Sequence, residues 1–267
     1  MRRSIASAPE RRSVITVLMV RSSFDIDARS IDRTMSEGLD RASASAAAAS
    51  GTDVLSDVLA SVRLTGSMLF LVDATTPWVT WAPRAEAFRP AVLPSAQHLV
   101  SYHVVTRGSC WAGLRGRQPQ RFEAGDVLVV PHGDAYFLAE PADAPDSYGH
   151  DEAVEFFRCM AAGKVPTTVN AGGGAPQTQF ICGFLGCHVR PFNPVLAALP
   201  PMIHLRGATP ASERMQHLID FAIAELRDDT SGSRGVLLRL AELMFVEVVR
   251  RQLEAVAGAS SGWLAGL

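Results

Sequence analysis

The chain has 267 residues, of which 48% are hydrophobic and 19% charged, enough for one well-buried core with an added helical layer. Its formal net charge of -2 lacks the basic excess usual in nucleic-acid-binding domains, so no direct DNA contact by this chain is expected. No apolar run reaches the roughly 18 residues that a membrane-spanning helix needs, because Pro, Gly or polar residues interrupt the longest uncharged stretches, so no membrane segment is expected.

Residues 1–52 predict a disordered N-terminal tail. They show no sustained periodicity and end in an Ala/Ser-rich stretch, residues 42–50, that can bury little surface. The apolar run 13–20 follows basic residues as in a secretory signal, but Arg21 stands where a small-residue cleavage site belongs. Four unevenly spaced cysteines do not indicate a disulfide framework, so a cytoplasmic location is expected.

The middle of the chain predicts an all-β sandwich or barrel. From about residue 67 to 189, short runs rich in Val, Phe, Trp and Leu alternate with Gly and Pro. The predicted strands are 68–72, 78–82, 99–106, 110–114, 127–130, 135–139, 179–184 and 185–189. Residues 140–178 are expected to be a long, mostly irregular connection.

After residue 190 the apolar spacing becomes helical. Asn193 and Pro194 predict the start of a short helix, and Thr209 and Pro210 the start of a second that ends near residue 227. A third helix is predicted over 235–257. Its apolar residues cover more than one stripe, so part of its surface is expected to pack against a partner.

One short pattern stands out in the β region. Residues 125–136, Gly-Asp-Val-Leu-Val-Val-Pro-His-Gly-Asp-Ala-Tyr, predict a strand, a tight turn and a second strand. This pattern resembles the second cupin motif. In metal-dependent cupins the position that Tyr136 holds here is a histidine ligand.

Several further stretches resemble the sensory domain of AraC-type transcription regulators, which has a cupin fold. They are residues 101–111, 182–187, 190–194, 199–204 and 238–246. The resemblance covers residues 53–267. It implies a mainly β fold: a cupin-like double-stranded β-helix barrel, followed by a C-terminal α-helical dimerisation segment. In this family the barrel binds an effector, two long helices dimerise, and separate helix-turn-helix units bind DNA.

The resemblance also implies a domain organisation. The tail of residues 1–52 precedes a ligand-binding barrel over 53–192 and a helical dimerisation segment over 193–260. Residues 261–267 look like the start of a linker to a DNA-binding domain that this sequence lacks. The expected function is effector sensing, without catalysis and without a DNA-binding module. The expected partners are a small-molecule effector and either a second copy or a full-length AraC-type regulator.

Cupins keep their ligand sites at the barrel mouth, which here suggests a pocket. The candidate ligand-binding residues are Tyr102, Trp111, His132 and Tyr136, with Cys182 nearby. Tyrosine, histidine and cysteine side chains suit too many ligands for the sequence to choose an effector.

The alternative function is a stand-alone metal-dependent cupin enzyme. Such an enzyme needs a cluster of His and Glu ligands, and the sequence does not show the usual set. A zinc site formed by Cys182 and Cys187 with His132 or His188 remains an alternative. Residues five apart on a regular strand point to opposite faces, so this site requires a bulge at Gly183 and Gly186. Otherwise the two cysteines pack as small hydrophobic residues.

Overall fold

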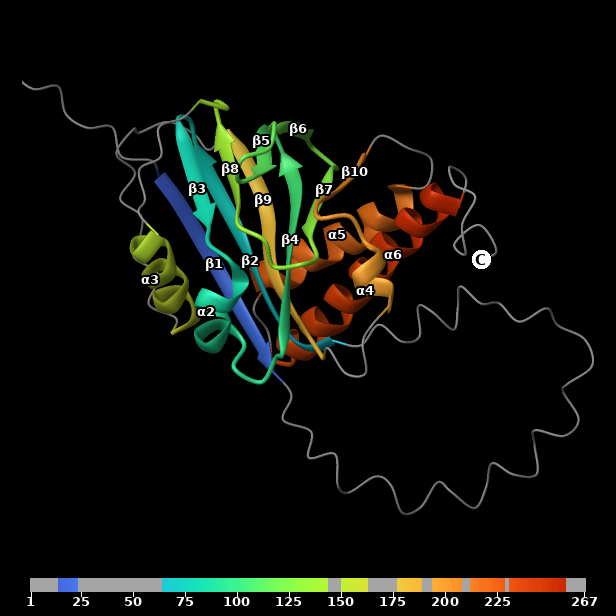
Figure 1. Cartoon of the computed structure of the whole chain (residues 1–267). Helices are drawn as coiled ribbons and strands as arrows, with labels where there is room; N and C mark the ends of the chain where they lie inside the picture. The colour runs from blue at the N-terminus through green and yellow to red at the C-terminus, as the bar shows by residue number, and fades with distance from the viewer. Residues whose placement is uncertain are drawn as a thin grey trace, which may run out of the picture.

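The computed structural model describes residues 14–23 (backbone only), 64–143, 150–162, 177–188, 194–207, 212–228 and 231–257. Within them the chain is mainly β, with two antiparallel sheets facing each other (Figure 1). The strands are β1 Val14–Ser23, β2 Leu64–Thr75, β3 Trp78–Ala82, β4 His98–Arg107, β5 Ser109–Leu114, β6 Gln120–Glu123, β7 Val127–Val130, β8 Tyr136–Glu140, β9 Thr178–Cys187 and β10 Ile203–Leu205.

The two sheets enclose one shared interior. The larger sheet has the order β1-β2-β9-β4-β7-β10 and the smaller one β3-β8-β5-β6. Apolar side chains from both sheets share one buried cluster, which includes Phe70, Trp78, Ala112 and Leu138. The interior between the sheets is therefore packed from both sides, as expected for the predicted cupin-like barrel.

The larger sheet is buried on both faces because residues along each strand alternate in direction. On β4, Leu99 and Val105 belong to the interior cluster, whereas Tyr102 and Val104 belong to a second cluster formed with the helices. This alternation decides which residues of β4 can reach the space between the sheets.

Two long helices cover the outer face of the larger sheet (Figure 1). They are α5 Ser212–Asp228 and α6 Ser233–Ala257, and α4 Pro194–Ala198 precedes them. All three were predicted, with boundaries within two residues for the long pair. Of the nine apolar α6 residues spaced for packing, seven are buried within this chain, and only Val236 and Leu243 are exposed. Less of this helix is therefore left for a partner than its sequence predicted.

A second pair of helices lies on the other side of the molecule (Figure 1). These are α2 Ala85–Val92 and α3 His150–Ala161. The Phe88 ring of α2 stacks on Phe157 of α3 with their centroids 4.5 Å apart. Residues 140–178 were predicted to be mostly irregular. That prediction is wrong for the twelve residues of α3, which are helical. The short amphipathic helix buries Ala153 and Phe157, which stabilises it by packing rather than by length.

Three other predictions need correction. The tail predicted for residues 1–52 contains β1, which pairs with β2 from Val14 to Ser23, while the rest of the tail lies outside the described residues. The Val-rich sequence of β1 has a high strand propensity. Its pairing with β2 satisfies the backbone hydrogen bonds of a strand edge that would otherwise be open. The strands predicted over 179–184 and 185–189 form one strand, β9. β10 pairs with β7 although it falls in the segment predicted to be helical.

None of the described helices is long and apolar enough to cross a membrane.

Candidate functional site

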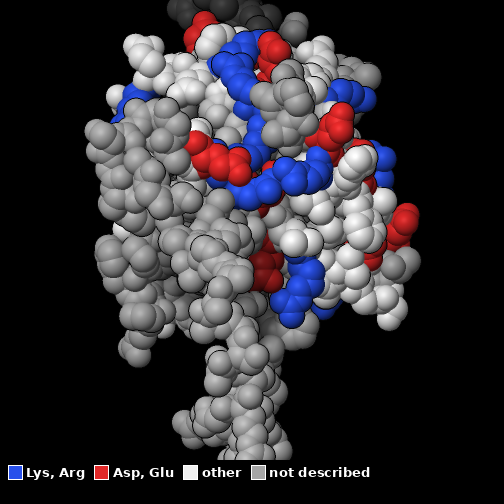
Figure 2. Space-filling view, turned by 90° about the vertical axis from the view of Figure 1, so that its right-hand side faces the viewer, with Lys and Arg blue, Asp and Glu red and all other residues white. Residues whose placement is uncertain are grey.

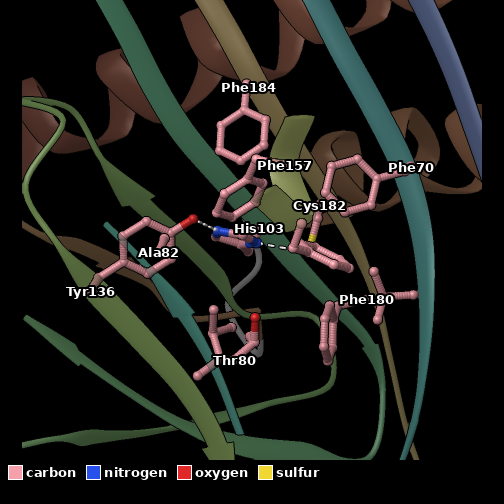
Figure 3. A pocket seen from close by; sticks show the side chains of 12 residues that line it. Phe70, Thr80, Ala82, His103, Tyr136, Phe157, Phe180, Cys182 and Phe184 are labelled. Carbon is pink, nitrogen blue, oxygen red and sulfur yellow. Dashed lines mark hydrogen bonds between the residues drawn. The ribbon is translucent and has the colours of Figure 1, made fainter. Parts of the chain in front are cut away.

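A pocket lies between the two sheets, beside α3 (Figure 3). Its empty space is about 430 Å³, which includes open solvent and is therefore an upper limit for a ligand. Its twelve lining residues come from β2, β3, β4, β8, β9 and α3. They are Phe70, Val72, Thr80, Ala82, His103, Tyr136, Leu138, Phe156, Phe157, Phe180, Cys182 and Phe184.

Three polar side chains form a hydrogen-bonded chain across this pocket. The β4–β9 register places His103 opposite Cys182, and His103 Nδ1 lies 2.9 Å from Cys182 Sγ. His103 Nε2 lies 2.6 Å from the Oη atom of Tyr136, and Tyr136 is the first residue of β8 in the other sheet. The imidazole thus links the two sheets through the interior (Figure 3).

All three groups are held in their uncharged forms at neutral pH. Burial lowers the pKa of His103 to about 3. Burial also raises the pKa of Tyr136, an effect that a hydrogen bond from Ser101 partly opposes. The pKa of Cys182 is raised well above its usual value, again mainly by burial. A buried thiol of this kind is a poor nucleophile because its thiolate is disfavoured.

A neutral imidazole donates a hydrogen bond from one nitrogen and accepts one at the other. The hydrogen bonds that link Cys182, His103 and Tyr136 can therefore take two arrangements. In one, Tyr136 donates to His103 Nε2 and Nδ1–H donates to the sulfur of Cys182. In the other, the Cys182 thiol donates to Nδ1, Nε2–H donates to the Tyr136 oxygen, and the Tyr136 proton is released for another acceptor. The pocket can therefore offer either a donor or an acceptor at Tyr136.

Aromatic rings form most of the remaining wall. Phe157 meets Phe184 edge to face, with centroids 5.3 Å apart, and Phe70 lies 6.2 Å from Phe184. Phe180 packs against Trp78 with centroids 5.3 Å apart. None of the twelve lining residues is Lys, Arg, Asp or Glu. The site thus combines an apolar aromatic surface with a few uncharged polar groups.

The structure places the predicted ligand-binding residues in different environments. Tyr136 lines the pocket, and so does Cys182. Tyr102 lies on the opposite face of β4, where its hydroxyl approaches Met215 Sδ of α5 at 3.8 Å. Tyr102 therefore belongs to the interface with the helices and not to the pocket, which corrects the prediction.

Trp111 and His132 also lie outside this pocket. On β5, Cys110 and Ala112 point inward, so the side chain of Trp111 points outward, where Arg121 lies 5.5 Å from its ring. His132 lies in the turn after β7, and its Nε2 is 2.8 Å from the Leu199 carbonyl oxygen. Trp111 is outside the pocket because side chains alternate along β5, and His132 is outside it because its ring is bound to a backbone carbonyl oxygen.

The structure does not bring the predicted zinc ligands together. Cys182 lies in the interior cluster and Cys187 in the cluster beneath the helices, so the two thiols are on opposite faces of β9. β9 pairs with β4 in unbroken register from Cys182 to Cys187, and the irregularity on its other side is an extra residue of β2 between Leu64 and Gly66, so β9 itself lacks the required bulge. Instead, a Cβ at Gly183 would collide with Leu69, and one at Gly186 would lie 2.8 Å from Ala96 Cβ. These glycines serve close packing.

His132, the third predicted ligand, is engaged by the Leu199 carbonyl. Within the part of the chain that the structure describes, no three His, Cys, Asp or Glu side chains gather as a metal site. Cys182 and Cys187 are both buried free thiols, Cys182 beside His103 and Cys187 among the apolar side chains beneath the helices.

His103 is the pocket residue that the sequence interpretation missed. Its position matches no metal-ligand spacing, so the sequence did not single it out. The signal that could have identified it is strand alternation, since Leu99, Ser101, His103 and Val105 share a face. Phe156 and Phe157 were missed because the helix that carries them was not predicted.

Three solved structures resemble parts of the chain. KdgF from Halomonas sp. matches 47% of this chain and 79% of its own, with 13% identity and a TM-score of 0.25. The Cnp3 cupin domain of Schizosaccharomyces pombe matches 49% and 68%, with 10% identity and a TM-score of 0.25. YhaK from Escherichia coli matches 55% and 43%, with 11% identity and a TM-score of 0.28.

Two curated relatives, from Streptomyces lividans and Streptomyces antibioticus, carry the name "Putative AraC-like transcription regulator". They are 28% identical to this chain over 184 and 180 residues, respectively, and each match covers 67% of this chain. The chain spans 56% of the length of each relative. The family model described as Cupin (Cupin_6) matches residues 53–254, so the chain belongs to the cupin family.

Proposed function

We propose that this chain is the effector-sensing part of an AraC-type transcription regulator and that a small molecule binds in the pocket between its sheets. The observation that carries the proposal is the pocket itself, which is lined by buried aromatic rings and an uncharged hydrogen-bonded chain. Ligand sites of small-molecule binders are typically concave, mainly apolar and provided with a few placed polar groups. The similarity to the AraC-like relatives supports regulation as the purpose of binding.

Dimerisation through α5 and α6 is the second part of the proposal. Three large apolar side chains are exposed among the described residues of these helices: Phe221 at 52%, Val236 at 36% and Leu243 at 54%. Val236 and Leu243 are seven residues apart and share one side of α6. The partner would be a second copy of this chain or a full-length AraC-type regulator.

We infer that this chain itself makes no direct contact with DNA. Figure 2 views the molecule from the side on which α5 and α6 lie in Figure 1, and basic side chains there are interspersed with acidic ones. Together with the net charge of -2, this pattern lacks the single-signed basic field that DNA-binding surfaces usually show.

The enzyme alternative is not favoured by any contact among the described residues. Metal-dependent cupin chemistry requires several side chains to hold the ion, and no such group is found in the described ranges. Elemental analysis of the purified protein addresses this alternative directly, since one firmly bound transition metal per chain would support it over the sensor.

A thermal-shift screen of small molecules tests the sensor proposal. Thr80→Phe places a ring in the pocket, because Thr80 lies on its wall (Figure 3). Thr75→Phe is the matched control, because Thr75 lies on the odd-numbered face of β2, opposite the face that carries Phe70 and Val72. We expect at least one compound to raise the Tm of the wild type and of Thr75→Phe, but not of Thr80→Phe. A broad screen without any compound of this behaviour would contradict the proposal.

A further inference from the structure

The chemistry of the pocket wall restricts the class of effector. Five of the twelve lining residues are phenylalanines, contributed by β2, β9 and α3, and none carries a formal charge at neutral pH. The polar lining groups are the hydroxyls of Thr80 and Tyr136, the imidazole of His103 and the thiol of Cys182. The following inference rests on the proposed function and specifies its ligand.

We propose that the pocket takes a compact, uncharged aromatic molecule that makes one hydrogen bond to the Tyr136–His103 pair. The aromatic part would pack against the rings of Phe70, Phe157 and Phe184, of which Phe184 lies tilted to Phe70 and edge to face with Phe157. The polar substituent would point towards Tyr136, whose hydroxyl is 2.6 Å from His103 Nε2.

The requirement for an uncharged ligand follows from the cost of burying a charge. An ion without a paired partner is strongly disfavoured in an apolar interior. Among the twelve lining residues no Arg or Lys is present to pair with a carboxylate, and no Asp or Glu to pair with an amine. The imidazole of His103 cannot substitute for them, since burial holds it neutral.

The preference for an aromatic over a sugar-like ligand follows from the number of polar partners. A sugar brings several hydroxyls, and each one buried without a hydrogen-bond partner weakens binding. The lining offers four polar side chains, and three of them already bond to one another. The space of about 430 Å³, solvent included, also limits the ligand to a small ring system.

The two arrangements of the His103 imidazole make the polar contact adaptable. With one tautomer the Tyr136 oxygen can accept from a ligand hydroxyl, and with the other its proton can be donated to a ligand carbonyl. The site therefore selects for the presence of one hydrogen-bonding group and tolerates either kind.

Five probes of similar size test this inference by calorimetric titration of the full chain. They are 4-methylphenol, toluene, benzoate, benzylammonium and D-xylose. We expect 4-methylphenol to bind at least tenfold more tightly than both ions and the sugar. Tyr136→Phe should weaken 4-methylphenol binding about fivefold, the value of one hydrogen bond near 1 kcal/mol, and should leave toluene binding unchanged.

Three results would overturn the inference. They are tighter binding of an ion or of xylose than of 4-methylphenol, retention of 4-methylphenol binding in Thr80→Phe, and an equal effect of Tyr136→Phe on toluene. The first leaves the sensor proposal intact, because a molecule still occupies the pocket. Failure of all five probes, while a screen hit of another class is lost in Thr80→Phe, overturns only the aromatic assignment. Failure of the five probes together with every screened compound overturns the sensor proposal as well.

Discussion

Two buried tyrosines show how a single position on a strand decides a side chain's role. Tyr136 and Tyr102 are both buried, and burial raises the pKa of each hydroxyl. Tyr136 bonds to a histidine inside the barrel at 2.6 Å, whereas Tyr102 meets only the thioether of Met215 at 3.8 Å among the described contacts. The loss of each hydroxyl should therefore have a different cost.

Removal of the Tyr136 hydroxyl should destabilise the fold more than removal of the Tyr102 hydroxyl. Tyr136→Phe leaves His103 without its Nε2 partner, and an unsatisfied buried polar group costs roughly 1–3 kcal/mol. Tyr102→Phe loses a contact with a weak acceptor, so we expect a change below about 1 kcal/mol. Urea unfolding of the two variants provides the comparison, and equal losses would contradict the role given to the His103 chain.

The pH dependence of stability should carry the signature of His103. Its folded-state pKa of about 3 lies below the ordinary value of 6.5, so between these values the unfolded chain binds a proton that the folded chain does not. Above about pH 6.5 this group therefore does not lower the free energy of unfolding. As the pH falls from 6.5 towards 3, His103 lowers the free energy of unfolding by about 1.4 kcal/mol per pH unit.

His103→Gln should remove this component of the slope, as measured by urea unfolding between pH 4 and 7. His217→Gln is the control, because His217 is exposed on α5 and should keep the wild-type slope. Asp126 also titrates in the acidic range. Burial acts to raise its pKa, but hydrogen bonds from His204, Gly207 and Glu123 lower it overall. That contribution is common to all three proteins and cancels in the comparison.

At the scale of elements, the end of β10 is fastened to the turn between β6 and β7. Asp126 Oδ1 accepts from Gly207 N at 2.8 Å, and Asp126 Oδ2 lies 2.8 Å from His204 Nε2. The two chain segments approach so closely that a Cβ on Gly207 would collide with the backbone of Gly125. This contact holds the shortest strand of the larger sheet in place.

Gly207→Ala and Gly235→Ala should shift stability in opposite directions. Gly207→Ala must push two backbone segments apart, so we expect a loss of about 1–3 kcal/mol. Gly235 lies within α6 with open space around its α-carbon, so alanine should stabilise the helix by up to about 1 kcal/mol. Thermal unfolding measures both, and a neutral Gly207→Ala would show that the β10 contact does not support the fold.

The elements that sequence patterns predicted are those whose periodicity is strong. The strands Trp78–Ala82 and Val127–Val130 have the predicted bounds, and the long helices lie within two residues of theirs. β1 and β10 were missed because their pairing depends on distant partners, β2 and β7, which local patterns do not reveal. α2 was not predicted, and it contains Pro90, a residue that usually ends or kinks a helix.

The candidate site was predicted less well than the fold, for a related reason. A sequence pattern shows which strand lies near a pocket, but a shift of one residue reverses the face to which a side chain belongs. The sequence interpretation chose Tyr102, and the pocket contains its neighbour His103. Tyr136 was correctly placed near the interior because the turn motif before it fixes its register with β3 and β5.

For the whole molecule, β4 is one of three strands, with β2 and β9, that connect the pocket and the helical layer. His103 faces the pocket, and the next residue in each direction, Tyr102 and Val104, packs in the cluster that contains α5 and α6. A molecule that contacts His103 therefore acts on a strand whose other face supports the helices proposed to dimerise. This arrangement gives the sensor proposal a direct physical route from the ligand to the partner surface.

The proposed partner surface makes the last prediction. Leu243→Glu should weaken self-association, because it places a charge at the most exposed large apolar side chain among the described residues of α6, while the monomer keeps its stability. Ala255→Glu adds the same charge at an exposed position on another side of α6 and should leave association unchanged. Light scattering after gel filtration over a concentration series separates the cases. A wild type that remains monomeric at the highest concentration would exclude the homodimer, and identical dimers of both variants would place the interface elsewhere.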